Sequence, residues 1–88
     1  MLSCIHKLIE VIVMNKYYFT FGTNHFTEGG TNLSNFYVVI EAESYYEARE
    51  KMFDVRGDKW AFQYESAEEA GVERFYLMEM KLSQVQLL

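Results

Sequence analysis

The sequence predicts an α+β domain: a four-stranded, largely antiparallel sheet in the order β-β-α-β-(short helix)-β, with one main helix packed on one face. Two patterns support this prediction. Several segments alternate large apolar residues with polar ones, which is typical of strands, whereas the segment after residue 44 repeats its apolar residues at helical spacing. Half of the residues are hydrophobic and 17% are aromatic, so the chain has enough apolar side chains for one core.

The first two expected strands span residues 16–22 and 36–42 and are rich in aromatic and β-branched side chains. We expect them to pair antiparallel. One face of the first strand carries three aromatic side chains, and the other face carries Tyr18. Residues 23–35 connect the strands through a loop that is long for a hairpin and contains several glycines and asparagines.

The main helix is expected to begin at Ser44, because Ser44 and Glu47 have the S-x-x-E spacing of a capping box. Gly57 is a natural end for this helix. Its apolar residues fall on one side and form the expected buried surface: Tyr45, Ala48, Met52 and Val55. Its opposite side is charged and faces water: Glu47, Glu50, Lys51 and Asp54.

Residues 59–65 are expected to form the third strand and residues 74–82 the fourth. One short helical turn is expected between them, from Ser66 to its end at Gly71. Ser66 and Glu69 repeat the capping-box spacing. One long helix covers only one face of such a sheet, yet the first two strands carry large residues on both faces. This surplus of apolar surface indicates a homodimer or a protein partner.

Residues 1–13 are expected to be a leader outside the fold, with a single domain spanning residues 14–88. Glu10 interrupts the apolar stretch and no small-residue cleavage pattern follows, so a signal peptide is not indicated. The spacing of the apolar residues also permits a short amphipathic helix. However, codons for the four residues before Met14 can contain GAGGUGAU, a purine-rich ribosome-binding sequence. This hypothesis predicts that translation starts at Met14.

The formal net charge of −5 disfavours direct binding to nucleic acid or to an anionic membrane, and a basic protein surface is the better partner. The same charge also serves solubility in many proteins. No apolar run is long enough to span a membrane. Cys4 is the single cysteine, so neither an intrachain disulfide nor a cysteine-based metal site is expected, and the composition suits the cytoplasm. No cofactor is expected.

Candidate interaction residues combine aromatic side chains, one histidine and exposed carboxylates: Tyr18, His25, Glu47, Glu50, Asp54, Trp60, Glu68 and Glu69. The carboxylates suit contact with a basic surface, although solvated helix faces carry the same residues. His25 is of the type that binds anions or acts as a base, but a structural role is favoured because neither a second histidine nor a cysteine lies near it. Trp60 alternates with two aromatic residues as in a base-stacking platform, but packing against the helix is favoured.

Three stretches resemble small, mostly uncharacterised proteins encoded by bacteriophages and prophages. They are F-T-F-G-x-x-H at residues 19–25, A-x-S-x-x-E-A-R at residues 42–49, and M-F…G-x-K-W-A-F-Q-Y at residues 52–64. The resemblance covers nearly all of residues 14–82 and none of the leader. It implies a bacterial cytoplasm and a host-takeover or counter-defence role, including the anti-CRISPR type, and it transfers no catalytic residues.

We therefore expect a small non-enzymatic binding protein that acts on a bacterial host protein. The alternative is a nucleotide or small-ligand binding protein that uses the His25 loop and exposed aromatic residues. An enzyme is the least expected, because no nucleophile–base pair and no metal-ligand spacing is recognisable.

Overall fold

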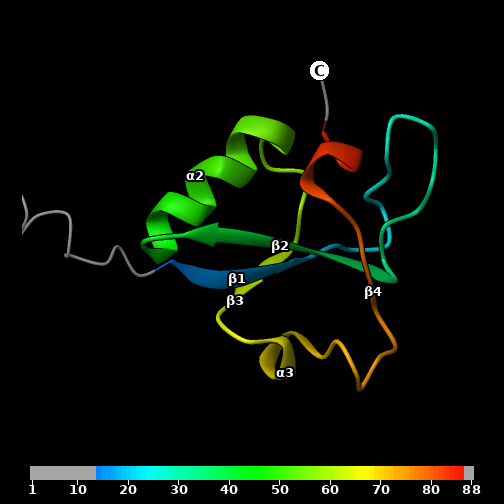
Figure 1. Ribbon diagram of the computed structural model, residues 1–88. Helices are drawn as coiled ribbons and strands as arrows, with labels where there is room; N and C mark the ends of the chain where they lie inside the picture. The colour runs from blue at the N-terminus through cyan, green and yellow to red at the C-terminus, as the bar shows by residue number, and fades with distance from the viewer. Residues whose placement is uncertain (1–13, 87–88) are drawn as a thin grey trace, which may run out of the picture.

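The computed structural model describes residues 14–86, so the expected leader, residues 1–13, lies outside the described residues. The described residues form an α+β fold (Figure 1). In chain order the elements are β1 (Asn15–Thr20), β2 (Phe36–Ala42), α2 (Tyr45–Arg56), β3 (Phe62–Tyr64), α3 (Ala67–Ala70), β4 (Met78–Glu79) and the 3-10 helix η1 (Leu82–Gln84).

The four strands form one mixed sheet in the order β3-β1-β2-β4. β1 pairs antiparallel with both β2 and β3, which confirms the expected pairing of the first two strands. β4 instead pairs parallel with β2. The path of the chain explains the parallel pair. After β3, at one edge of the sheet, the chain passes through α3 and crosses to the opposite edge, where β4 pairs with β2. We call residues 66–77 the crossing segment.

The helix α2 packs on one face of the sheet, as expected, and the main core lies between them (Figure 1). Side chains at alternate positions of β1 and β2 point to this face and are almost fully buried: Tyr17, Phe19, Phe21, Val38, Ile40 and Ala42. From the helix, Ala48 and Met52 are completely buried, while Tyr45 and Val55 pack partly against the same core. The helical spacing of the sequence thus identified the buried side of α2.

Both predicted helix starts are confirmed. The Ser44 hydroxyl accepts a hydrogen bond from the Glu47 backbone N–H, at 3.1 Å. The Glu47 carboxylate in turn accepts from the backbone N–H of Glu43, one residue earlier than in a standard capping box. Ser66 caps α3 in the same way, through the N–H of Glu69. Glu47 and Lys51, four residues apart on the charged side of the helix, also form an ion pair, with 3.8 Å between their charged atoms.

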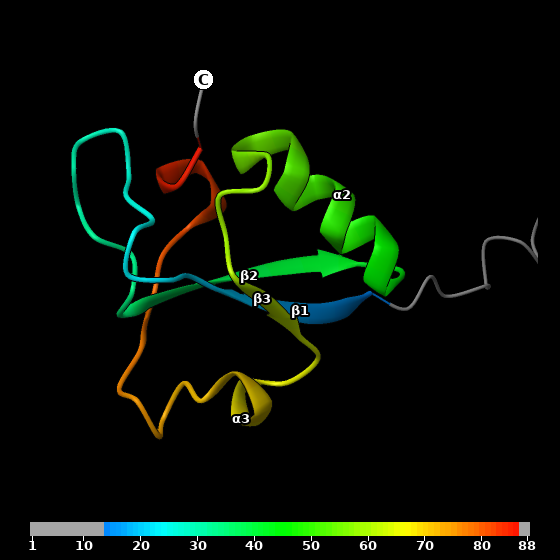
Figure 2. The same ribbon diagram turned by 180° about the vertical axis from the view of Figure 1, so that it is seen from behind.

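Two expected strands are shorter in the structure than the sequence predicts. Instead of residues 59–65, β3 contains only Phe62–Tyr64, because Trp60 turns under α2 rather than remaining in the sheet. Residues 74–82 do not form one strand, and β4 contains only Met78–Glu79. The preceding residues are turns, since the chain must cross below the sheet before it can pair with β2 (Figure 2).

Arg56, at the end of α2, is a core residue that the sequence pattern did not identify. It is only 3% exposed. Its guanidinium donates hydrogen bonds to the backbone carbonyls of Lys59, Val85 and Phe26, and lies 5.3 Å from the ring centre of Phe21. Arg56 therefore connects the helix end to the long β1–β2 loop and to the C-terminal segment, where Val85 is completely buried.

Candidate functional site

The face of the sheet opposite α2 is the main candidate for an interaction surface, and we call it the open face. Register places Tyr18 directly beside Val39 of β2 and Tyr64 of β3, so these side chains share one face. Thr20 lies beside Tyr37 and Phe62 in the same way. The open face is rich in aromatic rings because strand alternation sends these residues away from the helix.

The rings of the open face contact one another. The ring centres of Tyr18 and Tyr37 are 6.0 Å apart, and those of Phe62 and Tyr64 are 6.2 Å apart. The pKa of the Tyr37 phenol is raised, first by burial and then by the charge of Glu79 and by Tyr18.

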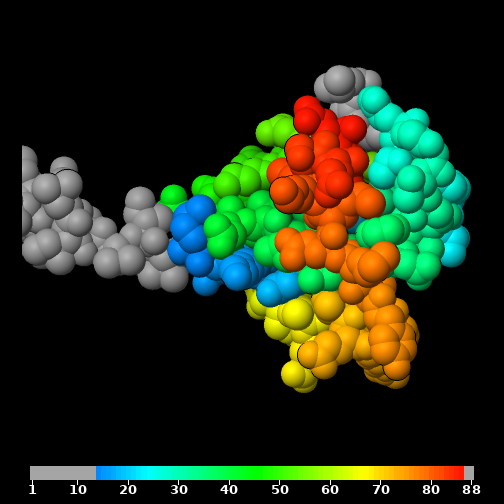
Figure 3. Space-filling model, turned by 45° about the vertical axis from the view of Figure 1, so that its right-hand side comes forward, coloured from blue at the N-terminus to red at the C-terminus, as the bar shows by residue number. Residues whose placement is uncertain are grey.

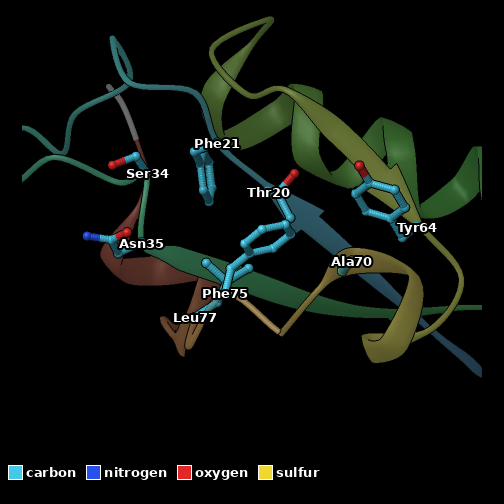
Figure 4. Close-up of a pocket in the computed structure, with 8 residues that line it drawn as sticks. All are labelled: Thr20, Phe21, Ser34, Asn35, Tyr64, Ala70, Phe75 and Leu77. Carbon is cyan, nitrogen blue, oxygen red and sulfur yellow. The ribbon is translucent and has the colours of Figure 1, made fainter. Parts of the chain in front are cut away.

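A hollow of about 360 Å³ lies between the open face and the crossing segment (Figure 4). Its described lining is uncharged: Thr20, Phe21, Ser34, Asn35, Tyr64, Ala70, Phe75 and Leu77. The crossing segment brings the last three of these residues against β3 and against β1, which is far from them in sequence. A hollow of this composition suits an apolar side chain whose polar end contacts the hydroxyl and amide groups at the rim.

The crossing segment has two unusual residues beside this hollow. Gly71 ends α3 with φ +78°, and a Cβ at this position would lie 2.5 Å from the Phe75 ring. Tyr76 has φ +55°, which side chains rarely adopt, and is 87% exposed. Keeping a tyrosine in the left-handed region costs about 1–2 kcal/mol. Strained and exposed aromatic residues are characteristic of binding sites rather than of cores.

We expect Gly71→Ala to lower the free energy of unfolding by about 1 kcal/mol, because a left-handed φ is unfavourable for alanine. The new methyl group also displaces the Phe75 ring from the edge of the hollow. Urea denaturation measures the first effect. Gly29→Ala is the matched control, since the nearest atom to its Cβ would be Thr27 Oγ1 at 3.8 Å. An equal loss of stability in both variants would contradict the geometric account.

Two large exposed apolar side chains belong to the same region. Phe75 is 61% exposed, and Phe62, on the open face, is 63% exposed. In the space-filling view, the crossing segment protrudes below the body of the molecule, coloured yellow to orange (Figure 3). Exposed aromatic residues beside an uncharged hollow are a typical arrangement for recognition of another protein.

The predicted acidic residues do not form one patch. Glu47, Glu50 and Asp54 belong to α2, above the sheet, whereas Glu68 and Glu69 belong to α3, below it (Figures 1 and 2). Because the sheet separates the two groups, they cannot contact one basic surface together. Tyr18, in contrast, does lie on the open face.

The structure gives His25 a local structural contact. Its Nδ1 atom accepts a hydrogen bond from the Gly22 backbone N–H, at 2.8 Å. Its ring meets Phe21 edge to face, with 6.2 Å between the ring centres. The pKa of His25 is lowered, mainly by burial and then by the positive charges of Arg56 and Lys59. A neutral imidazole that accepts through Nδ1 and holds the start of the β1–β2 loop fits all these contacts.

The lowered pKa of His25 predicts a pH dependence. As pH falls below about 6.5, His25 of the unfolded chain binds a proton before His25 of the folded protein does. The free energy of unfolding therefore declines until the pH reaches the lowered pKa of His25 in the folded protein. We expect His25→Asn, whose amide oxygen can replace Nδ1 as acceptor, to lose less stability over this range. Urea denaturation at neutral pH and at about pH 5 compares the two proteins. Identical losses would show that His25 does not cause the dependence.

Trp60 is part of the core and does not form a stacking platform. It is 9% exposed, and its Nε1 donates a hydrogen bond to the Gly57 carbonyl. Its ring meets Phe19 and Phe53 edge to face. Phe75 and Tyr76 are among the exposed rings that the sequence did not single out as candidates. Their sequence neighbourhood, R-F-Y-L-M, has a composition typical of a strand and gives no sign of a turn.

Among residues 14–86, no helix is long and apolar enough to cross a membrane. Within the same range, no three histidine, cysteine or carboxylate residues lie close enough together to hold a metal ion. No protein-family model matches the chain, and neither a curated protein nor a solved structure is significantly similar to it.

Proposed function

We propose that this chain is a non-enzymatic binding protein that contacts a protein partner through the open face and the crossing segment. One observation carries the proposal: Phe75 lines an uncharged hollow, and the next residue, Tyr76, is strained and exposed. An apolar side chain of the partner would enter the hollow, while the exposed rings pack around it. Aromatic anchors around a central pocket supply most of the binding free energy in many protein interfaces.

Charge indicates the kind of partner. The net charge is −5, and exposed carboxylates of Glu68, Glu73 and Glu79 lie along or directly after the crossing segment. A partner with basic residues around an apolar protrusion would complement this surface. Such complementarity mainly accelerates association and weakens as salt concentration rises.

The resemblance to bacteriophage and prophage proteins supports a bacterial host protein as the partner. Within this proposal the chain acts in the bacterial cytoplasm as a host-takeover or counter-defence protein, including the anti-CRISPR type. The basic nucleic-acid-binding site of a defence nuclease has the required charge. The fold by itself supports the binding role only, because one fold serves many functions.

Affinity capture with matched variants tests the proposed function. Tyr76→Asn removes the exposed ring while asparagine tolerates the left-handed backbone, so the variant is expected to remain folded. We expect it to lose most of the partner that the wild-type chain captures from bacterial lysate. Tyr46→Ser is the control, because Tyr46 is 76% exposed but lies on α2. Equal capture by all three proteins would contradict the proposal.

A nucleotide or small ligand is the second candidate, because about 360 Å³ lies within the range of ligand pockets. The ligand would occupy the hollow rather than the neighbourhood of Trp60, whose ring is buried. A thermal-shift screen with nucleotides tests it, since a ligand that binds only the folded state raises the midpoint of unfolding. A screen without any shift would contradict this candidate.

A further inference from the structure

The β1–β2 loop contributes to the hollow from both of its ends. Phe21 lines the hollow at the start of the loop, and Ser34 and Asn35 line it at the end (Figure 4). These two ends are separated in sequence by the rest of the loop. The shape of the hollow therefore depends on how the two ends are held relative to each other.

His25 connects the two ends of the loop. Its Nδ1 atom accepts a hydrogen bond from the backbone N–H of Gly22, the residue that follows Phe21. Its backbone carbonyl accepts a hydrogen bond of 2.9 Å from the N–H of Leu33, the residue that precedes Ser34. Leu33 is completely buried, so the end of the loop is fixed against the core. His25 thus relates the Phe21 side of the hollow to the opposite side.

The hydrogen bond from Gly22 depends on the protonation of His25. A protonated Nδ1 atom is a donor, so it cannot accept from a backbone N–H. The side-chain oxygen of Asn24 is an acceptor for this proton. A Cβ at Gly22 would lie 3.4 Å from Asn24 Oδ1 and 3.6 Å from His25 Nδ1, so the two atoms are near each other. Protonation therefore favours Asn24 over Gly22 as the partner of the imidazole.

Charged groups from neighbouring segments act on the same imidazole. The pKa of His25 is lowered first by burial, then by Arg56 at the end of α2 and by Lys59 in the turn that follows, while Asp58 acts in the opposite direction. The Arg56 guanidinium also lies 5.3 Å from the ring centre of Phe21. A positive charge on His25 would therefore repel the residue that packs against the Phe21 ring.

Other hydrogen bonds of the loop do not depend on this proton. The Asn32 side chain donates to the Thr23 carbonyl, at 2.7 Å, and Phe26 forms an isolated β-bridge with Asn32. Arg56 also donates to the Phe26 carbonyl. The loop thus stays attached to the body when His25 is protonated, and the change is confined to the peptide between residues 21 and 22 and to the adjoining side of the hollow.

We propose that His25 is a pH-controlled switch for the hollow: its protonation releases the Gly22 N–H, displaces Phe21 and weakens binding in the hollow. The weaker binding rests on the proposed function, whereas the displacement of Phe21 does not. Binding weakens because the displaced ring no longer borders the bound group. By linkage, an occupied hollow makes His25 harder to protonate.

Nuclear magnetic resonance of the full chain as a function of pH tests the switch. We expect the amide signals of Gly22, Ser34 and Asn35 to shift with the same midpoint as the His25 imidazole, below about pH 6.5. His25→Asn should abolish these shifts, because its amide does not titrate. His6→Asn, which replaces the other histidine of the chain, should preserve them. Signals that do not follow the His25 midpoint, or that shift equally in His25→Asn, would overturn the proposal.

Binding is measured with p-cresol, which has the apolar ring and the polar end of a tyrosine side chain. Its dissociation constant is determined from amide shifts at neutral pH and at a pH where the imidazole signal shows His25 to be protonated. We expect the constant to rise about fivefold or more in the wild-type chain and to stay unchanged in His25→Asn. Equal constants at both pH values, or an equal rise in both proteins, would overturn the switch.

This proposal and the proposed function fail separately. Amide signals that ignore the protonation of His25, in a chain that still loses its partner on Tyr76→Asn, would contradict the switch alone. Absence of p-cresol binding at neutral pH would contradict the hollow as a binding site, and the amide titration then decides the displacement of Phe21 by itself.

Discussion

Arg56→Met is expected to lower the free energy of unfolding by about 3–5 kcal/mol, which is a large fraction of the stability of a small domain. Methionine retains much of the apolar bulk but leaves the carbonyls of Lys59, Val85 and Phe26 without their donor. Hydrogen bonds from a charged group contribute about 1.5–3 kcal/mol each, and buried acceptors without a donor add a further cost. Without the Arg56 guanidinium, both the β1–β2 loop and the C-terminal segment lose their hydrogen bonds to the end of α2.

Thermal and urea denaturation measure this effect, and we expect the midpoint of thermal unfolding to fall by about 15–30 °C. Arg49→Met is the control. The Arg49 guanidinium lies 4.9 Å from the Trp60 ring centre and 5.4 Å from that of Phe53, so its contacts are cation–π contacts. Such contacts contribute about 0.5–1 kcal/mol at exposed sites. Equal destabilisation by both substitutions would show that Arg56 does not join the three segments as described.

Trp60→Ala is expected to cost about 3–5 kcal/mol of stability, because it removes a large buried ring from the contact between α2 and the sheet. The edge-to-face contacts with Phe19 and Phe53 are lost, and so is the hydrogen bond from Nε1 to the Gly57 carbonyl. A cavity next to the completely buried Phe19 is the main source of the cost. Urea denaturation followed by far-ultraviolet circular dichroism measures it.

Trp60→Phe is the matched variant, since it keeps an aromatic ring in the cavity and removes only the indole bulk and its donor. We expect a loss well below that of alanine. Tyr64→Ala, on the open face, is the comparison for a half-buried ring and is expected to cost less than Trp60→Ala. A negligible effect of Trp60→Ala would place this ring outside the core and restore it as an exposed stacking candidate.

Much of the architecture was predictable because local signals in this chain agree with the tertiary structure. Strand alternation divided the side chains of β1 and β2 between two faces without showing which face α2 covers, whereas helical spacing identified the buried side of α2. The two serine caps fixed the helix starts to within a residue. These signals depend on neighbours in sequence, so they are readable without knowledge of the fold.

The remaining features depend on contacts between distant segments. The pattern of residues 74–82 is that of a strand, but the crossing below the sheet leaves only Met78–Glu79 available for pairing. Arg56 was not expected in the core because its acceptors come from three separate segments. The same crossing creates the hollow, so neither Phe75 nor Tyr76 could be recognised as part of a site.

The acidic candidates illustrate the same limit. Glu47 and Glu68 are close enough in sequence to suggest a shared surface, but they lie on opposite sides of the sheet. The proposed interaction therefore rests on aromatic side chains at the hollow, with negative charge as a general contribution.

Amide hydrogen exchange of the chain, alone and bound to its captured partner, is the most direct measurement of the proposed binding surface. The account predicts that binding slows exchange mainly in residues 71–79 and in the adjoining part of the β1–β2 loop at Ser34 and Asn35. The charged side of α2 should exchange at the same rate in both states. Slower exchange confined to α2, with residues 71–79 unchanged, would contradict the account.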